Sequence, residues 1–103
     1  MNTVDITKKV LAKMPKDKEV DTDGLLSLIY NVLSEENEDR VRTDDLCEVL
    51  YKIEKSLMSA FNYNWRDTDS GKAGLTIEEW AAKSVDDYIY RHGKYLKDEG
   101  FIE

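Results

Sequence analysis

The sequence predicts an all-α fold, in which the whole chain, residues 1–103, forms a single domain built as a compact four-helix bundle. Three observations lead to this prediction. Apolar residues recur at spacings of three and four along four segments, which is the period of amphipathic helices. Residues that favour a helix start precede these segments. Most links between the segments are short, as in helices packed against their neighbours.

The first two helices are predicted over residues 3–14 and from residue 21 to the acidic stretch that begins at Glu35. Thr3 is the expected N-cap of the first helix, and Pro15 prevents its continuation. Acidic and hydroxyl side chains at 21–23 stabilise the start of the second helix. Its expected apolar face consists of Leu25, Leu28, Ile29, Val32 and Leu33.

The third helix has the clearest pattern in the chain and is expected to lie at the centre of the core. Thr43 is its expected N-cap, and Asp44 and Asp45 follow in the first turn, where acidic groups interact favourably with the helix dipole. Its apolar stripe covers four turns. The stripe consists of Leu46, Val49, Leu50, Ile53, Leu57, Ala60 and Phe61.

An irregular loop over residues 62–75 is expected between the third and fourth helices. The fourth helix is predicted from Thr76 to about Lys97. Thr76 and Glu79 have the spacing of a capping box, in which each side chain bonds the backbone amide of the other residue. Gly100 is the expected stop signal.

Residues 67–79 resemble the calcium-binding loop of an EF-hand. That loop supplies oxygen ligands at fixed positions, ends in a bidentate glutamate at position 12 and needs glycine at position 6 for a sharp turn. If the count starts at Asp67, Asp69 stands at position 3 and Glu78 at position 12. A shift of one residue places Glu79 last. The resemblance implies a calcium site made of Asp67, Asp69, Glu78 and Glu79.

The same stretch departs from the EF-hand pattern at three positions. Gly71 offers no side-chain oxygen, Lys72 stands where glycine is needed and adds a positive charge, and Gly74 replaces the aliphatic anchor. The capping box at Thr76 explains the stretch without a metal. We therefore expect a turn with no metal or other cofactor, and keep the calcium site as the alternative.

Composition excludes several classes of function. The net charge of −7 argues against direct binding to nucleic acid, because phosphates would be repelled. No apolar run approaches the length of about 18 residues that spans a membrane, so we expect a cytoplasmic protein without membrane contact. Cys47 is the single cysteine, which fits a reducing compartment, and we expect it to be a half-buried core residue. One histidine, no nucleophile–base pattern and no phosphate-binding glycine loop indicate that the protein is not an enzyme.

Negative charge is concentrated in two blocks of the sequence. Residues 21–48 carry a net charge of −7 and residues 67–87 a net charge of −4, whereas the remaining segments are neutral or positive. Helical carboxylates three or four residues apart stand about 5–6 Å from one another, close to the spacing of phosphates along a strand. The acidic candidates for partner binding are Glu35, Glu36, Glu38, Asp39, Asp44, Asp45, Glu78, Glu79, Asp86 and Asp87.

Aromatic residues offer a second candidate surface. Tyr63, Trp65 and Tyr90 exceed what the predicted core stripes use, as do Tyr88 and Tyr95. Tyrosine and tryptophan are favoured anchors of protein interfaces.

These patterns predict a small acidic interaction protein that inhibits a nucleic-acid-handling protein by binding its basic surface. Virus-encoded inhibitors of host defence, such as anti-CRISPR proteins of phages and other nucleic-acid mimics, are of this general type. A single calcium-binding module and a helical bundle of the bacteriocin-immunity type are the alternatives. An acidic face that is only solvated also fits the charge pattern.

Overall fold

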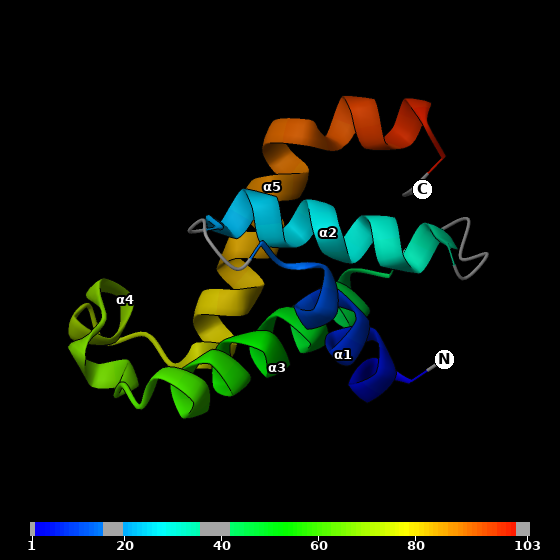
Figure 1. Cartoon of the computed structure of the whole chain (residues 1–103). Helices are drawn as coiled ribbons and strands as arrows, with labels where there is room; N and C mark the ends of the chain where they lie inside the picture. Colours follow the sequence, from blue (N-terminus) through cyan, green and yellow to red (C-terminus); the bar gives the residue numbers. More distant parts are fainter. Residues whose placement is uncertain (1, 16–19, 36–41, 101–103) are drawn as a thin grey trace.

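The computed structural model describes residues 2–15, 20–35 and 42–100, and every regular element in these ranges is helical (Figure 1). The all-α prediction is therefore confirmed. The expected loop at 62–75 contains two short helical turns, η1 and α4. The elements are α1 (Thr3–Lys13), α2 (Thr22–Glu35), α3 (Thr43–Phe61), the 3₁₀ turn η1 (Trp65–Asp67), α4 (Asp69–Lys72) and α5 (Ile77–Asp98).

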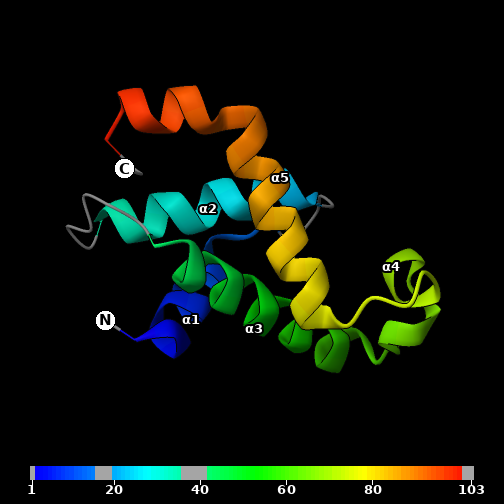
Figure 2. The same ribbon diagram turned by 180° about the vertical axis from the view of Figure 1, so that it is seen from behind.

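Helix α3 is the centre of the fold, because it contacts α1, α2 and α5. Figures 1 and 2 show α5 crossing α3 and then bending sharply. Leu96, near the end of α5, is only 2% exposed, so the last turns of α5 also cover the core. The four long helices of the prediction are present, but they do not lie aligned as in a regular four-helix bundle.

The core stripe of α3 is buried over its first half only. Leu46, Val49, Leu50 and Ile53 have no exposed surface, as the stripe predicts. Leu57 is half-buried, Ala60 is exposed, and Phe61 is 73% exposed. The prediction for Ala60 and Phe61 was wrong because α3 extends beyond the helices that cover its first half (Figure 1).

Helix α2 contributes more to the core than its stripe predicts, and α5 contributes a tyrosine. Leu26 and Tyr30 of α2 are buried together with Leu25, Ile29, Val32 and Leu33, whereas Leu28 is half-buried. Tyr88 of α5, which the sequence places among the surplus aromatic residues, is only 7% exposed. Its ring stacks on Tyr30 at 5.8 Å between centroids, and its hydroxyl lies 3.2 Å from the Ser27 hydroxyl. This stack joins α5 to α2 before α5 bends.

Two helices have their N-cap one residue earlier than expected, and α5 has the capping box that the sequence predicts. Asn2 caps α1 by accepting from the Asp5 amide, so Thr3 is the first helical residue. Arg42 occupies the N-cap of α3 without a side-chain bond, and Thr43 follows inside the helix. The capping box of α5 is confirmed: the Thr76 hydroxyl accepts from the Glu79 amide at 3.0 Å, and the Thr76 amide donates to the Glu79 carboxylate at 3.2 Å.

The bent half of α5 is tied to the start of α2 by a bidentate ion pair. Both terminal nitrogens of Arg91 lie 2.6 Å from the two carboxylate oxygens of Asp23. The hydrogen bonds from Arg91 lower the pKa of Asp23 below its usual value. Asp87 bonds the same guanidinium at 3.0 Å. Within the described part of the chain, the helices are too short or too polar to cross a membrane.

Candidate protein-binding site

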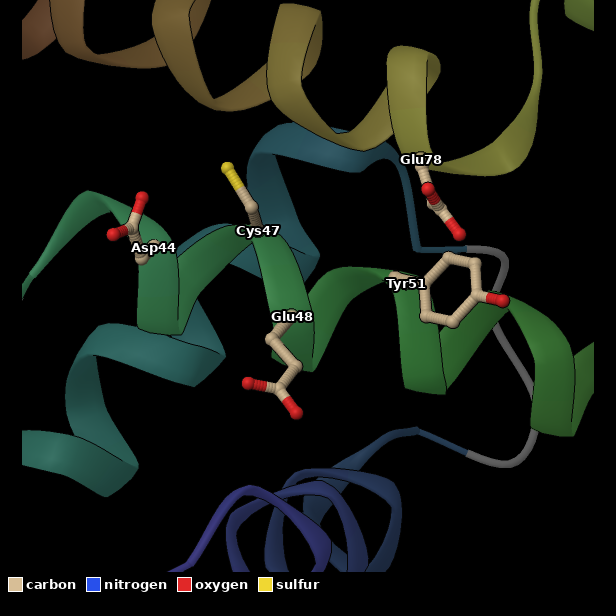
Figure 3. A pocket seen from close by; sticks show the side chains of 5 residues that line it. All are labelled: Asp44, Cys47, Glu48, Tyr51 and Glu78. Atoms are coloured by element: carbon tan, nitrogen blue, oxygen red, sulfur yellow. The ribbon is translucent and has the colours of Figure 1, made fainter.

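An open pocket with a volume of about 330 Å³ lies between α3 and the first turns of α5. We call it the α3–α5 pocket. Its inner surface is mostly apolar, although most of its lining residues carry polar groups at their ends. Those residues are Asp44, Cys47, Glu48, Tyr51 and Glu78 (Figure 3).

Helical periodicity explains why four of the five lining residues share one side of α3. Positions 44, 47, 48 and 51 follow one another at the spacings of three and four that place side chains on one helix face. This stripe runs beside the buried core stripe. The fifth residue, Glu78, stands in the first turn of α5, whose position is fixed by the Thr76 capping box.

The carboxylates of the pocket do not all point the same way. Figure 3 shows Glu78 directed toward the Tyr51 ring and Asp44 at the opposite end of the lining. The Glu48 carboxylate instead points toward α1, where it accepts from the Thr3 hydroxyl at 3.1 Å. The two ends of the pocket are therefore negative, at Asp44 and at Glu78, and the middle is not.

Cys47 occupies the middle of the pocket, with its sulfur directed toward α5 (Figure 3). Burial raises the pKa of its thiol, and the nearby negative charges of Asp86 and Asp44 raise that pKa further. Asp86, on the second turn beyond Glu78, thus lies close enough to act on this thiol. The thiol stays protonated and uncharged at neutral pH, which does not favour a role as nucleophile.

Tyr51 forms the aromatic wall of the pocket and already contacts a cation. The ammonium of Lys55 lies 4.9 Å from the centroid of the Tyr51 ring. A hydrogen bond with Tyr51 raises the pKa of Lys55, and the charge of Glu78 adds to that effect. A positive group is therefore stabilised at this edge of the pocket.

The structure brings some of the acidic candidates together and uses others elsewhere. Asp44 and Glu78 line the α3–α5 pocket, and the charge of Asp86 acts on the Cys47 thiol of the same pocket; we call these three residues the acidic face. Glu35 pairs with Lys13 at 2.5 Å, and Asp87 bonds Arg91.

The five remaining acidic candidates have other surroundings or fall outside the described part of the chain. Glu79 is held in the capping box. Asp45 is half-buried in the first turn of α3. Glu36, Glu38 and Asp39 lie outside the described residues.

Two of the three aromatic candidates make internal contacts. The Tyr63 hydroxyl donates to Glu54. The indole nitrogen of Trp65 donates to the Leu75 carbonyl at 2.7 Å, and its ring meets Trp80 edge-on at 5.6 Å. Tyr90, by contrast, is 89% exposed on α5.

The stretch that resembles an EF-hand folds as two helical turns. Asp67 ends η1 and Asp69 begins α4. Between them, the Thr68 hydroxyl accepts from the Gly71 amide at 3.0 Å and donates to the Trp65 carbonyl at 2.7 Å. Over the described ranges, no three histidine, cysteine, aspartate or glutamate side chains gather closely enough to hold a metal ion.

Sequence reasoning did not identify Glu48, Tyr51 or Lys55 as site residues, and it assigned Cys47 to the core only. The signal that could have identified them is the second stripe at 44, 47, 48 and 51. Comparisons of the chain with protein-family models, with curated proteins and with solved structures give no significant match.

Proposed function

We propose that this chain is a non-catalytic protein that binds a basic surface of another protein through its acidic face. The observation that carries the proposal is the convergence of the two acidic sequence blocks. Asp44 comes from the first block, and Glu78 and Asp86 come from the second. Asp44 and Glu78 line one pocket, and Asp86 acts on the thiol of that pocket, because α5 crosses α3 (Figure 1).

The acidic face forms no strong internal ion pair, although the Lys55 ammonium stands near Glu78. Among the described residues, Glu78 and Asp86 form no ion pair. Asp44 has Arg42 at 3.9 Å, but both side chains are almost fully exposed, and such pairs contribute little. By contrast, the carboxylate of Asp23 forms a close bidentate ion pair with Arg91. A basic partner would therefore meet the acidic face without first displacing a strong internal pair.

A partner that handles nucleic acid is the class that this charge pattern fits best. Grooves that bind phosphates are lined by lysine and arginine, and carboxylates on a helix face are spaced similarly to phosphates. The net charge of −7 favours encounter with such a groove and opposes contact with the nucleic acid itself. We propose that occupying the groove inhibits the partner in the cytoplasm, as a virus-encoded inhibitor of a defence nuclease of the anti-CRISPR type would.

The test compares two charge-reversal variants with the same net charge. Asp44→Lys/Asp86→Lys reverses the acidic face, whereas Asp98→Lys/Glu99→Lys reverses two exposed acids at the end of α5. Binding to oligo-lysine and oligo-arginine peptides is measured at several salt concentrations, after circular dichroism has shown that both variants fold.

We expect only the acidic-face reversal to weaken binding, with the wild-type association rate falling as salt rises. Equal binding by both variants would contradict the proposal and leave the acidic face as a solvated surface. The exposed tyrosines Tyr90 and Tyr95 would then be the next candidates.

A further inference from the structure

We infer that the α3–α5 pocket receives one arginine side chain of the basic partner, held by the Tyr51 ring between the carboxylates of Asp44 and Glu78. This inference rests on the proposed function, since it names the group by which the basic partner is anchored. It goes further in assigning the contact to one cavity and one chemical group, the guanidinium.

The shape and lining of the pocket match a long side chain with a charged end. Its volume of about 330 Å³ stands at the low end of ligand cavities, which measure roughly 300–1,000 Å³. That volume suits one side chain better than a large cofactor. An arginine would place its methylene groups on the apolar inner surface, beside the uncharged Cys47 thiol, and its guanidinium at a negative end.

The Tyr51 ring already has a cation beside it, which supports a cationic occupant. The chain's own Lys55 ammonium already lies over the Tyr51 ring, 4.9 Å from its centroid. Lys55 is attached one helical turn beyond Tyr51, so it reaches the edge of the pocket from α3 itself. It therefore acts as an internal stand-in for the partner's cation, and the two would compete for the same ring.

Arginine fits this site better than lysine does. A guanidinium is planar, stacks on an aromatic ring and donates two parallel hydrogen bonds to a carboxylate. It is also more weakly hydrated than an ammonium, so it loses less when it enters a mostly apolar cavity. The Glu78 carboxylate, directed toward the Tyr51 ring, is placed to receive such a pair of bonds (Figure 3).

Cys47 provides a direct reporter, because it is the single cysteine and its sulfur lies in the pocket. The rate of its alkylation by iodoacetamide is measured with increasing N-acetyl-arginine methylamide. The matched probes are the lysine compound and the citrulline compound, which has nearly the shape of arginine without its charge. We expect saturable protection by arginine, weaker protection by lysine and none by citrulline.

Variants separate the contributions of the three side chains. Glu78→Gln should weaken arginine binding, and Lys55→Gln should strengthen it, each by roughly two- to fivefold, the range for one exposed charge interaction. Tyr51→Ala should abolish the preference for arginine over lysine, whereas Tyr51→Phe should keep it because the ring remains. Asp98→Asn, which removes one exposed acid at the end of α5 as Glu78→Gln does at its start, is the control and should change nothing.

The outcomes distinguish this inference from the proposed function. If basic peptides need the acidic face but Cys47 stays unprotected and Tyr51→Ala has no effect, the pocket inference is overturned and the proposed function stands. If the arginine compound protects Cys47 but basic peptides bind both charge-reversal variants equally, the pocket binds arginine and the proposed function fails. Equal protection by lysine, or weaker arginine binding in Lys55→Gln, would overturn the arginine assignment.

Discussion

Gly71 stands at the most crowded backbone position among the described glycines. It lies in the segment 62–76, which contains η1 and α4 and which we call the projection. Replacing Gly71 by alanine tests how tightly the projection is packed. A Cβ at this position would lie 2.0 Å from the carbonyl oxygen of Trp65 and 2.8 Å from its carbonyl carbon. These are backbone atoms, so no side-chain rotation relieves the overlap. The same carbonyl accepts from the Thr68 amide at 3.0 Å and from the Thr68 hydroxyl at 2.7 Å.

The expected cost follows from these contacts. Non-bonded heavy atoms pack at about 3.5 Å, so the Trp65 carbonyl would have to move by about 1 Å or more. That movement breaks or weakens two hydrogen bonds, each with a net worth of about 1 kcal/mol. Overpacking adds about 1–3 kcal/mol. We therefore expect Gly71→Ala to destabilise the projection by about 3 kcal/mol.

The two tryptophans of the chain make this change measurable, because Trp65 of the projection packs against Trp80 of α5. Urea unfolding is followed by tryptophan fluorescence and by far-ultraviolet circular dichroism, with amide exchange at 71–75 as a local readout. The control is Gly93→Ala, whose Cβ would meet only Ile89 at 4.0 Å. Alanine should stabilise that helical position by about 0.5–1 kcal/mol.

A specific result would refute the reasoning about Gly71. If Gly71→Ala shifts stability by less than about 0.5 kcal/mol by both spectroscopic probes and leaves amide exchange unchanged, the close approach to Trp65 does not exist in solution. A Gly93→Ala variant as destabilised as Gly71→Ala would show that any added methyl group is harmful here, and that the steric argument has no predictive value.

Three further predictions concern the core, the capping box and the buried tyrosine. Leu50→Ala or Ile53→Ala, at fully buried positions, should each cost about 2–5 kcal/mol in urea melts, and a loss below about 0.5 kcal/mol at both would contradict the packing. Thr76→Ala should cost about 1 kcal/mol in thermal melts, and residues 67–79 should bind calcium no tighter than about 10 μM by titration calorimetry. Burial raises the pKa of Tyr30 from 10.0 to about 12, so the folded state keeps a proton that the unfolded state releases. Stability should therefore fall as pH rises from about 10 to about 12, less steeply in Tyr30→Phe, and equal slopes would show that Tyr30 is not buried.

Helix caps could be predicted from the sequence where the two residues that form the hydrogen bonds stand within one helical turn of each other. The capping box at Thr76 and Glu79 is the best example, since its two hydrogen bonds depend only on residues three apart. The start of α3 shows the limit of such signals. Thr43 and Arg42 are both adjacent to the helix, and local preference favoured the threonine although the structure places Arg42 at the N-cap.

Burial was predictable only where a helix face is covered along its whole length. The periodicity of apolar residues indicates which face of a helix is apolar, but it does not indicate where the helices packed against that face end. Phe61 therefore fits the stripe of α3 and is nevertheless exposed. Tyr88 shows the opposite error, because its burial depends on Tyr30, 58 positions earlier in the sequence.

The pocket itself could not be predicted from the sequence, because it depends on where α5 crosses α3. The sequence indicated that Asp44 and Glu78 belong to two acidic blocks, but not that they stand at two ends of one cavity. Cys47 was expected to be half-buried and is so. That its thiol faces α5 rather than the centre of the core follows only from the tertiary arrangement.

The projection over 62–76 is held by bonds between residues that are near neighbours in the sequence, such as Trp65 to Leu75 and Thr68 to Gly71. Closing so short a loop loses little chain entropy, so the projection is able to form within microseconds. The core must instead bring α1 and α5 onto α3 from distant parts of the chain. Folding should thus have two kinetic phases. The rapid local phase should appear as a change in tryptophan fluorescence before the helices dock. The bend of α5 onto α2 belongs to the slower phase.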